Sequence, residues 1–408
     1  MIKQILGGVT AAKGFEAAAT AAKIKYQDRM DMALIYSEVP CVAAGAFTQN
    51  IVKAAPVKWD QAIIGESETA QAIIVNAGIA NACTGDEGYG YCEESAKVAG
   101  IGLGIEANQV LIGSTGVIGK QLPMDKITAG IQKLSVSKGA SAAHATKAAK
   151  AIMTTDTYEK EKAVAFTIGS KTVTIGGMAK GSGMIYPNMC TMLSFVTTDA
   201  VISKETLQKA LSEDVGDTYN MISVDGDTST NDTVLVLANG LAGNDEIKEG
   251  TPEYALFTKA LNEINEYLAK KIAGDGEGAT ALFEVQVNNA SSVEQAKALA
   301  KSIVCSSLTK TAIAGHDANW GRILCAMGYA GVNFEPEKVD LFFESQAGKI
   351  QIIANGTATN YSEEQATKIL SEKEVTAIAD IKEGNKSATA WGCDLTHEYI
   401  AINADYRS

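Results

Sequence analysis

The stretch from Lys180 to Phe195 carries the residues with the clearest chemical potential. It reads Lys-Gly-Ser-Gly-Met-Ile-Tyr-Pro-Asn-Met-Cys-Thr-Met-Leu-Ser-Phe, so Thr191 stands where a loop with glycine and proline gives way to an apolar, β-prone run. Most threonines at such a junction simply begin a strand, because β-branched side chains suit a pleated sheet. The alternative is a nucleophile made by self-cleavage. In that case the Thr191 hydroxyl attacks the carbonyl of Cys190, and hydrolysis of the ester leaves Thr191 at the start of a new chain.

A free α-amine would make Thr191 a working nucleophile. A threonine hydroxyl is weak and needs an adjacent base. The α-amine of an N-terminal residue has a reference pKa of about 7.7–8.0, so it can take the hydroxyl proton near neutral pH. The chain has only three histidines, His144, His316 and His397, which argues against a histidine-based triad or a histidine-rich metal site. The shortage of histidine therefore strengthens the case for Thr191.

The run from Lys180 to Leu193 resembles the self-cleavage site of the ornithine acetyltransferases, the glutamate N-acetyltransferases of arginine biosynthesis. The family usually carries alanine before the threonine, whereas this chain carries Cys190, which is also small. The resemblance implies that the precursor is cut between Cys190 and Thr191. It also implies that Thr191 is the nucleophile of the mature enzyme.

A glycine loop at residues 113–119 is the second match. It reads Gly-Ser-Thr-Gly-Val-Ile-Gly, which is neither a Walker A motif nor G-x-G-x-x-G, so nucleotide binding is not predicted. In the family, the Thr-Gly pair of this loop forms the oxyanion hole. The resemblance therefore implies that Thr115 and Gly116 stabilise the oxyanion here, and a plain turn is the alternative.

The resemblance also assigns positions that contact the substrate. Taken alone, Lys180 would be a solvated lysine and Glu277 an exposed loop carboxylate, and a chain end usually frays. The family pattern implies instead that Glu277 lies in the substrate pocket. Because amino-acid substrates carry both charges, we expect Lys180 to pair with the substrate α-carboxylate and Glu277 with an ammonium group. The substrate-binding positions that the family pattern implies are Thr154, Lys180, Thr191, Glu277, Asn403 and Ser408.

The resemblance extends from Val9 to Ser408 and implies a ping-pong acetyl transfer from N-acetylornithine to glutamate. The products would be ornithine and N-acetylglutamate. Family members differ in whether acetyl-CoA is also a donor, and no residue of this chain decides that question. A self-processing aminopeptidase or amidase of related architecture, with water in place of glutamate, is the second interpretation. A non-catalytic binding protein is the third, and it predicts an uncut chain.

The composition is that of a globular enzyme. The 408 residues are 46% hydrophobic and carry a net charge of -13 without a basic cluster, which argues against nucleic acid and anionic membranes as partners. The seven cysteines are scattered and contain no Cys-x-x-Cys, which favours reduced thiols in the cytoplasm. Neither a signal-like N-terminus nor an apolar run of about 18 residues is evident.

No metal or resident cofactor is expected. Residues 223–233 alternate Asp225, Asp227, Ser229 and Asn231, in the manner of a calcium loop. However, the run lacks glycine at its sixth position and an acid at its twelfth, so it fails the EF-hand pattern. The same run resembles a family loop near the active site, and we expect a packed polar loop without a metal.

Strand-like and helix-like segments alternate along the chain, which predicts an α/β fold. We expect helices over 138–153, 203–215, 252–272 and 292–308, with strands that include 71–75 and 109–112. The resemblance implies a layered α/β sandwich with a smaller C-terminal α/β domain at about 285–395. It also implies that self-cleavage gives chains 1–190 and 191–408, which stay together as a heterotetramer of two α and two β chains.

Overall fold

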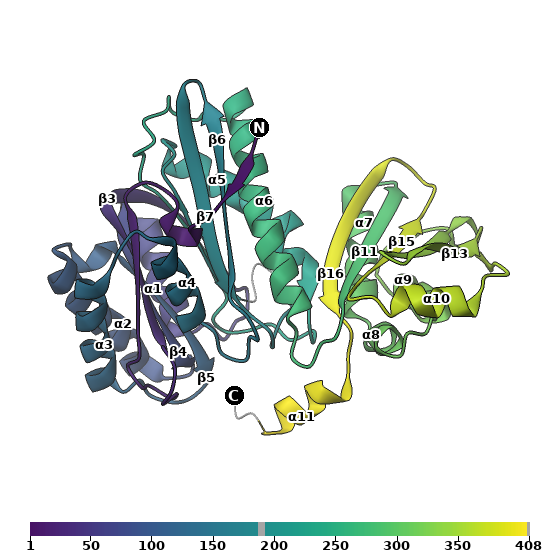
Figure 1. Ribbon diagram of the computed structural model, residues 1–408, viewed down its shortest axis with the longest axis horizontal. Helices are drawn as coiled ribbons and strands as arrows, with labels where there is room; N and C mark the ends of the chain where they lie inside the picture. Colours follow the sequence, from purple (N-terminus) through teal and green to yellow (C-terminus); the bar gives the residue numbers. More distant parts are fainter. Residues whose placement is uncertain (187–191, 406–408) are drawn as a thin grey trace.

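The computed structural model describes residues 1–186 and 192–405 and has two β-sheets with a long helix, α6, between them (Figure 1). Within these residues, no helix is both long and apolar enough to span a bilayer. The helices are α1 (Ala55–Glu66), α2 (Gly85–Leu103), α3 (Met124–Ser137), α4 (Ala142–Ala151), α5 (Lys204–Asp217), α6 (Pro252–Gly274), α7 (Val293–Cys305), α8 (Ser307–Ala314), α9 (Trp320–Gly328), α10 (Glu363–Leu370) and α11 (His397–Asp405).

The first sheet has nine strands in the order β1-β6-β7-β8-β10-β3-β4-β5, with β2 paired to β3. The long strand β3 joins two layers, because residues 42–47 pair with β10 while residues 32–36 pair with β2 and β4. The strands are β1 (Lys3–Ile5), β2 (Phe15–Thr20), β3 (Met32–Phe47), β4 (Ala70–Ile79), β5 (Val110–Val117), β6 (Lys160–Ile168), β7 (Lys171–Lys180), β8 (Leu193–Thr198) and β10 (Thr233–Ala238).

Strand β10 shows why this part is a layered sandwich. All six of its residues are buried, and alternate side chains point to opposite faces of a strand. Leu235 and Leu237 pack into the core that contains β2–β5 and α2–α4, while Val234 and Val236 pack into the core that contains α5 and α6. A strand with apolar cover on both faces lies inside the stack of layers, which confirms the predicted α/β sandwich.

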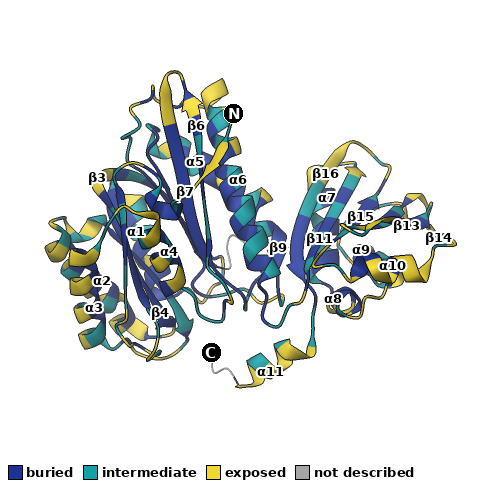
Figure 2. Cartoon of the chain, viewed as in Figure 1, coloured by how far each residue is buried: buried dark blue, intermediate teal, exposed yellow. Residues whose placement is uncertain are grey.

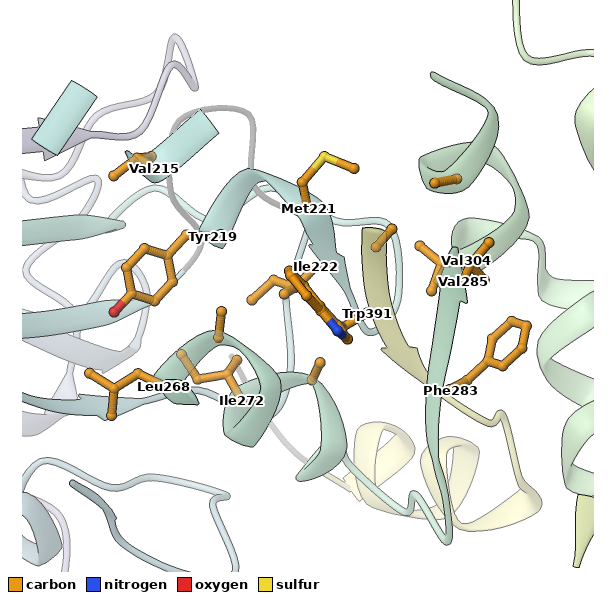
Figure 3. Close-up of a cluster of buried hydrophobic side chains, with 14 of the residues drawn as sticks. Val215, Tyr219, Met221, Ile222, Leu268, Ile272, Phe283, Val285, Val304 and Trp391 are labelled. Atoms are coloured by element: carbon orange, nitrogen blue, oxygen red, sulfur yellow. The ribbon is translucent and has the colours of Figure 1, made fainter. Parts of the chain in front are cut away.

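The second sheet has the order β14-β13-β12-β15-β11-β16-β9. Its core joins that of the first sheet, since Ile222 of β9, Ile272 of α6 and Trp391 of β16 pack in one cluster (Figure 3). Figure 2 shows that strands such as β4 and β7 are largely buried. Helices on the outside of the molecule, such as α3 and α10, expose much of their surface. The strands are β9 (Ile222–Ser223), β11 (Leu282–Ala290), β12 (Asp340–Ser345), β13 (Gly348–Ala354), β14 (Thr357–Ala358), β15 (Glu374–Asp380) and β16 (Lys386–Cys393).

Local capping signals locate the helix starts. The Thr251 side chain accepts a hydrogen bond from the backbone N–H of Tyr254, and Pro252 opens α6, as the sequence predicts. The helix expected at 138–153 begins only at Ala142, because Gly139 pairs with Ala17 through two backbone hydrogen bonds of 3.0 Å. A neighbouring strand thus takes backbone groups that the alanine-rich run would have used for a helix.

Candidate active site

A cavity of about 290 Å³ lies where β7 ends and β8 begins, facing α11. Met192, the residue that follows Thr191 in the chain, lines this cavity. The predicted residues Cys190, Thr191 and Ser408 lie outside the described residues. The other six predicted site residues all line it: Thr115, Gly116, Thr154, Lys180, Glu277 and Asn403. Segments that are far apart in the sequence therefore meet at one cavity.

Thr115 and Gly116 reach the cavity near the end of β5. Gly116 has a φ of +127°, and a Cβ on it would lie 2.2 Å from the carbonyl carbon of Gly78 on β4. Only glycine fits this backbone contact. The amide of Asn231 donates hydrogen bonds of 2.6 and 2.8 Å to the carbonyl oxygens of Ala80 and Ser114, which ties the ends of β4 and β5 together.

Gly116→Ala is expected to lower turnover at this cavity by about 10²-fold, since the β5 backbone must shift to relieve the contact with Gly78. Gly119→Ala is the matched control, because Gly119 also has a positive φ, +79°, but a Cβ there meets no atom within 4 Å. That control should cost about 1–2 kcal/mol of stability and leave turnover unchanged. Steady-state kinetics and thermal melts of both purified variants measure this. Equal kcat values for the two variants would contradict it.

Lys180 sits above a cluster of buried charges. Its side chain is 9% exposed, and its Nζ lies 3.9 Å from Oδ2 of Asp156. The fully buried Lys160 links Asp156, at 2.7 Å, to Asp275, at 2.6 Å. Asp156 also accepts a hydrogen bond of 2.6 Å from the backbone N–H of Gly181. The last residue of β7 is therefore held through both its side chain and the following peptide group.

In this cluster, burial and the neighbouring opposite charges shift the pKa values of Lys180 and Asp156 in opposite directions. Burial lowers the pKa of Lys180, and the nearby Asp156 carboxylate raises it in part. Burial by itself would raise the pKa of Asp156, but the Lys180 and Lys160 ammonium groups outweigh it and hold that pKa well below its ordinary value. Lys180 also lines the cavity.

Glu277 is nearly buried, at 9% exposed, although a glycine-rich loop suggests an exposed carboxylate. Its Oε2 accepts a hydrogen bond of 2.8 Å from Nδ2 of Asn403 on α11, and its backbone N–H donates to the carbonyl of Ser182 at 2.8 Å. A Cβ on Gly183 would lie 2.4 Å from the Glu277 carboxyl carbon, so this carboxylate packs directly on the 181–185 turn. The long-range contact with that turn explains the burial.

The polar loop at 223–233 forms one side of the cavity. Asp225, Asp227, Ser229, Thr230, Asn231 and Asp232 all line it. The resemblance placed this run near the active site, and the structure shows which of its side chains line the cavity. Across 1–186 and 192–405, no group of three or more His, Cys, Asp or Glu side chains is arranged to hold a metal ion.

A model of the ArgJ family matches residues 16–408, almost the whole chain. The chain belongs to the ArgJ family. It is 51% identical over 399 residues to the arginine biosynthesis bifunctional protein ArgJ of Thermotoga neapolitana, covering 97% of this chain and 99% of that protein. It is 49% identical over 408 residues to the ArgJ protein of Symbiobacterium thermophilum, with 99% of each covered.

A crystal structure of ArgJ from Bacillus halodurans is also similar, with 49% identity and a TM-score of 0.51. The match covers 100% of that chain and 53% of this one. Membership of the ArgJ family confirms the predicted ornithine acetyltransferase resemblance and makes the chain an acyltransferase of arginine biosynthesis. It favours the acetyltransferase over both the aminopeptidase and the non-catalytic interpretation.

Proposed function

We propose that this ArgJ chain transfers an acetyl group from N-acetylornithine to glutamate through an acetyl-Thr191 intermediate. The observation that carries the proposal is the convergence of six predicted residues from five separate segments on one cavity, which Met192 also lines. The active protein is then a cytoplasmic heterotetramer of two α chains (1–190) and two β chains (191–408). Residues 285–395 form most of a smaller C-terminal domain.

Self-cleavage comes first in this scheme. The Thr191 hydroxyl attacks the Cys190 carbonyl, so that an ester C–O bond forms and the peptide C–N bond breaks. The nitrogen of Thr191 takes up the hydroxyl proton and becomes a free amine. Water then hydrolyses the ester, which leaves a carboxylate on Cys190 and a free hydroxyl and amine on Thr191.

Acetyl transfer reuses the same hydroxyl. The Thr191 amine takes the hydroxyl proton as the oxygen attacks the acetyl carbonyl of N-acetylornithine, and the tetrahedral oxyanion forms beside Thr115 and Gly116. The C–N bond breaks, ornithine leaves with the proton, and the amine of glutamate then attacks the acetyl ester. N-acetylglutamate departs and Thr191 regains its proton.

The charged lining suits amino-acid substrates. Lys180 faces the substrate α-carboxylate and Glu277 an ammonium, while Thr154 and Asn403 supply hydrogen-bonding groups from two further elements. Ser408 completes the set in the proposal. Since similar proteins are named bifunctional, we extend the proposal to acetyl-CoA as a second acetyl donor to Thr191, with no resident cofactor.

Intact mass and N-terminal identification of freshly purified protein test the proposal. Two chains, one beginning at Thr191, are expected, and the second chain should gain the mass of one acetyl group with N-acetylornithine. Added glutamate should remove that acetyl group as N-acetylglutamate. Acetyl-CoA in place of N-acetylornithine should give the same product with release of free CoA. An uncut chain that no donor acetylates would refute the nucleophile.

Thr115→Val is expected to lower kcat by about 10²–10³-fold, since it removes one hydroxyl donor to the oxyanion and keeps the side-chain shape. Thr167→Val, on an exposed position of β6, is the control and should keep the wild-type rate. Both are assayed per mole of cleaved chain, so that slower processing does not count as slower transfer. A kcat within twofold of wild type for Thr115→Val would remove this residue from the oxyanion hole.

A further inference from the structure

The carboxylate of Asp225 binds the turn that precedes the cleavage segment. Its Oδ2 accepts a hydrogen bond of 2.6 Å from the backbone N–H of Met184, and its Oδ1 accepts one of 2.9 Å from the backbone N–H of Ile185. A carboxylate that binds two successive amides makes charge-assisted contacts, which are stronger and more directional than neutral ones. Asp225 therefore holds the backbone of the turn that follows β7.

The turn that Asp225 binds is strained. Met184 has a φ of +55°, in the left-handed region that costs a residue with a Cβ about 1–2 kcal/mol. Such backbone strain persists only where surrounding contacts enforce it, and it gathers at functional sites. Here two residues close to Asp225 in the chain also bind this turn. Val224 donates its N–H to the Ile185 carbonyl at 2.7 Å, and the Thr228 hydroxyl donates to the Tyr186 carbonyl at 2.8 Å.

The same loop also holds the far side of the cleavage segment. The carbonyl of Met192 accepts a hydrogen bond of 2.8 Å from the N–H of Thr233, and Leu193 then pairs with Thr233 as β8 joins β10. Residues 224–233 thus bind the chain both before and after the segment with the Cys190–Thr191 bond. Met184, Ile185 and Met192 all line the cavity, so both bound ends lie at the site.

We propose that Asp225 is a positioning residue for the proposed cleavage between Cys190 and Thr191: by holding the Met184–Ile185 turn it keeps the backbone before the cleavage segment in place. The inference rests on the proposed self-cleavage and adds a residue to it. Asp225 takes no part in the bond changes. Its effect is on geometry, where a displacement of about 1 Å can slow a reaction 10²-fold.

Time-resolved processing of newly translated chain tests this. The uncut 42.7 kDa precursor and its two products are followed by mass in wild type, Asp225→Asn and Asp199→Asn. Asp199 is the matched control: its carboxylate also accepts two backbone N–H groups, from Lys13 at 3.0 Å and Thr174 at 2.7 Å. It follows the other end of β8, roughly 20 Å along the strand from Leu193. Cleavage should slow about 10²-fold in Asp225→Asn and stay near wild type in Asp199→Asn.

Asp225→Glu separates charge from shape. Asparagine has the shape of aspartate but puts an amide N–H against a backbone N–H, whereas glutamate is longer and keeps two charged acceptors. If the Asp225 carboxylate positions the turn, Asp225→Glu should be cleaved at least tenfold faster than Asp225→Asn. If Asp225 only fills space, the order of the two rates should be reversed. Cleavage of Asp225→Asn at the wild-type rate, or equal slowing in Asp199→Asn, would overturn the inference. An uncut wild type that no donor acetylates would instead refute the proposed function itself.

Discussion

Thr191→Ala is expected to give a single uncut chain of 42.7 kDa with no measurable acetyl transfer. The substitution removes the hydroxyl that attacks Cys190 in the proposed scheme, so no new N-terminal amine should form. It also removes the atom that would carry the acetyl group. Loss of a covalent nucleophile lowers kcat by orders of magnitude, here on the order of 10⁴-fold or more. Intact mass and the production of N-acetylglutamate measure the two effects separately.

Thr191→Ser is the control for that experiment, because it keeps a hydroxyl and, after cleavage, an adjacent amine. It should be cut and should transfer acetyl at reduced rates. Cys190→Ala restores the residue that usually precedes the threonine and should be cut completely. Retained transfer in Thr191→Ala, from either donor, would rule out the acetyl-threonine mechanism.

Lys160→Met is expected to lower the free energy of unfolding by about 3–5 kcal/mol, because it leaves two buried carboxylates, Asp156 and Asp275, without their shared cation. Removal of one partner from a buried ionic cluster costs much more than removal of an exposed charge. Urea unfolding of the cleaved protein measures the change. Lys160→Met should also displace residues at the active site, since Asp156 binds Lys180 and the Gly181 peptide group.

Lys162→Met, two residues further along β6, is the matched control. Lys162 makes an ion pair of 3.1 Å with Glu263, whose side chain is 39% exposed, so its removal should cost about 1 kcal/mol or less. Equal destabilisation by the two substitutions would contradict the importance of the buried cluster. The buried cluster should also make the stability of the wild-type protein depend on pH in acid. The lowered pKa of Asp156 stabilises the fold above its unfolded pKa of about 3.9, and this stability is lost as the pH falls further.

The sequence by itself determined the local chemistry. The Lys180–Leu193 run predicted the cleavage site and family, the Thr115–Gly116 pair predicted the oxyanion loop, and Thr251-Pro252 predicted the start of α6. These signals are carried by residues that are adjacent in the chain, so their meaning does not depend on the fold. The ArgJ family match confirmed the family, and the structure confirmed the start of α6.

Only the tertiary structure decided which charges are buried and what they face. Glu277 looks like an exposed loop carboxylate until the 181–185 turn packs against it, and the Lys160 cluster joins residues 115 positions apart. The polar loop around Asp225 becomes a wall of the cavity only when β8 and β10 pair. Burial, pKa shifts and the hydrogen bonds of Asp225 to the Met184–Ile185 turn all arise from contacts between segments that are distant in the chain. No local pattern of residue types encodes those contacts.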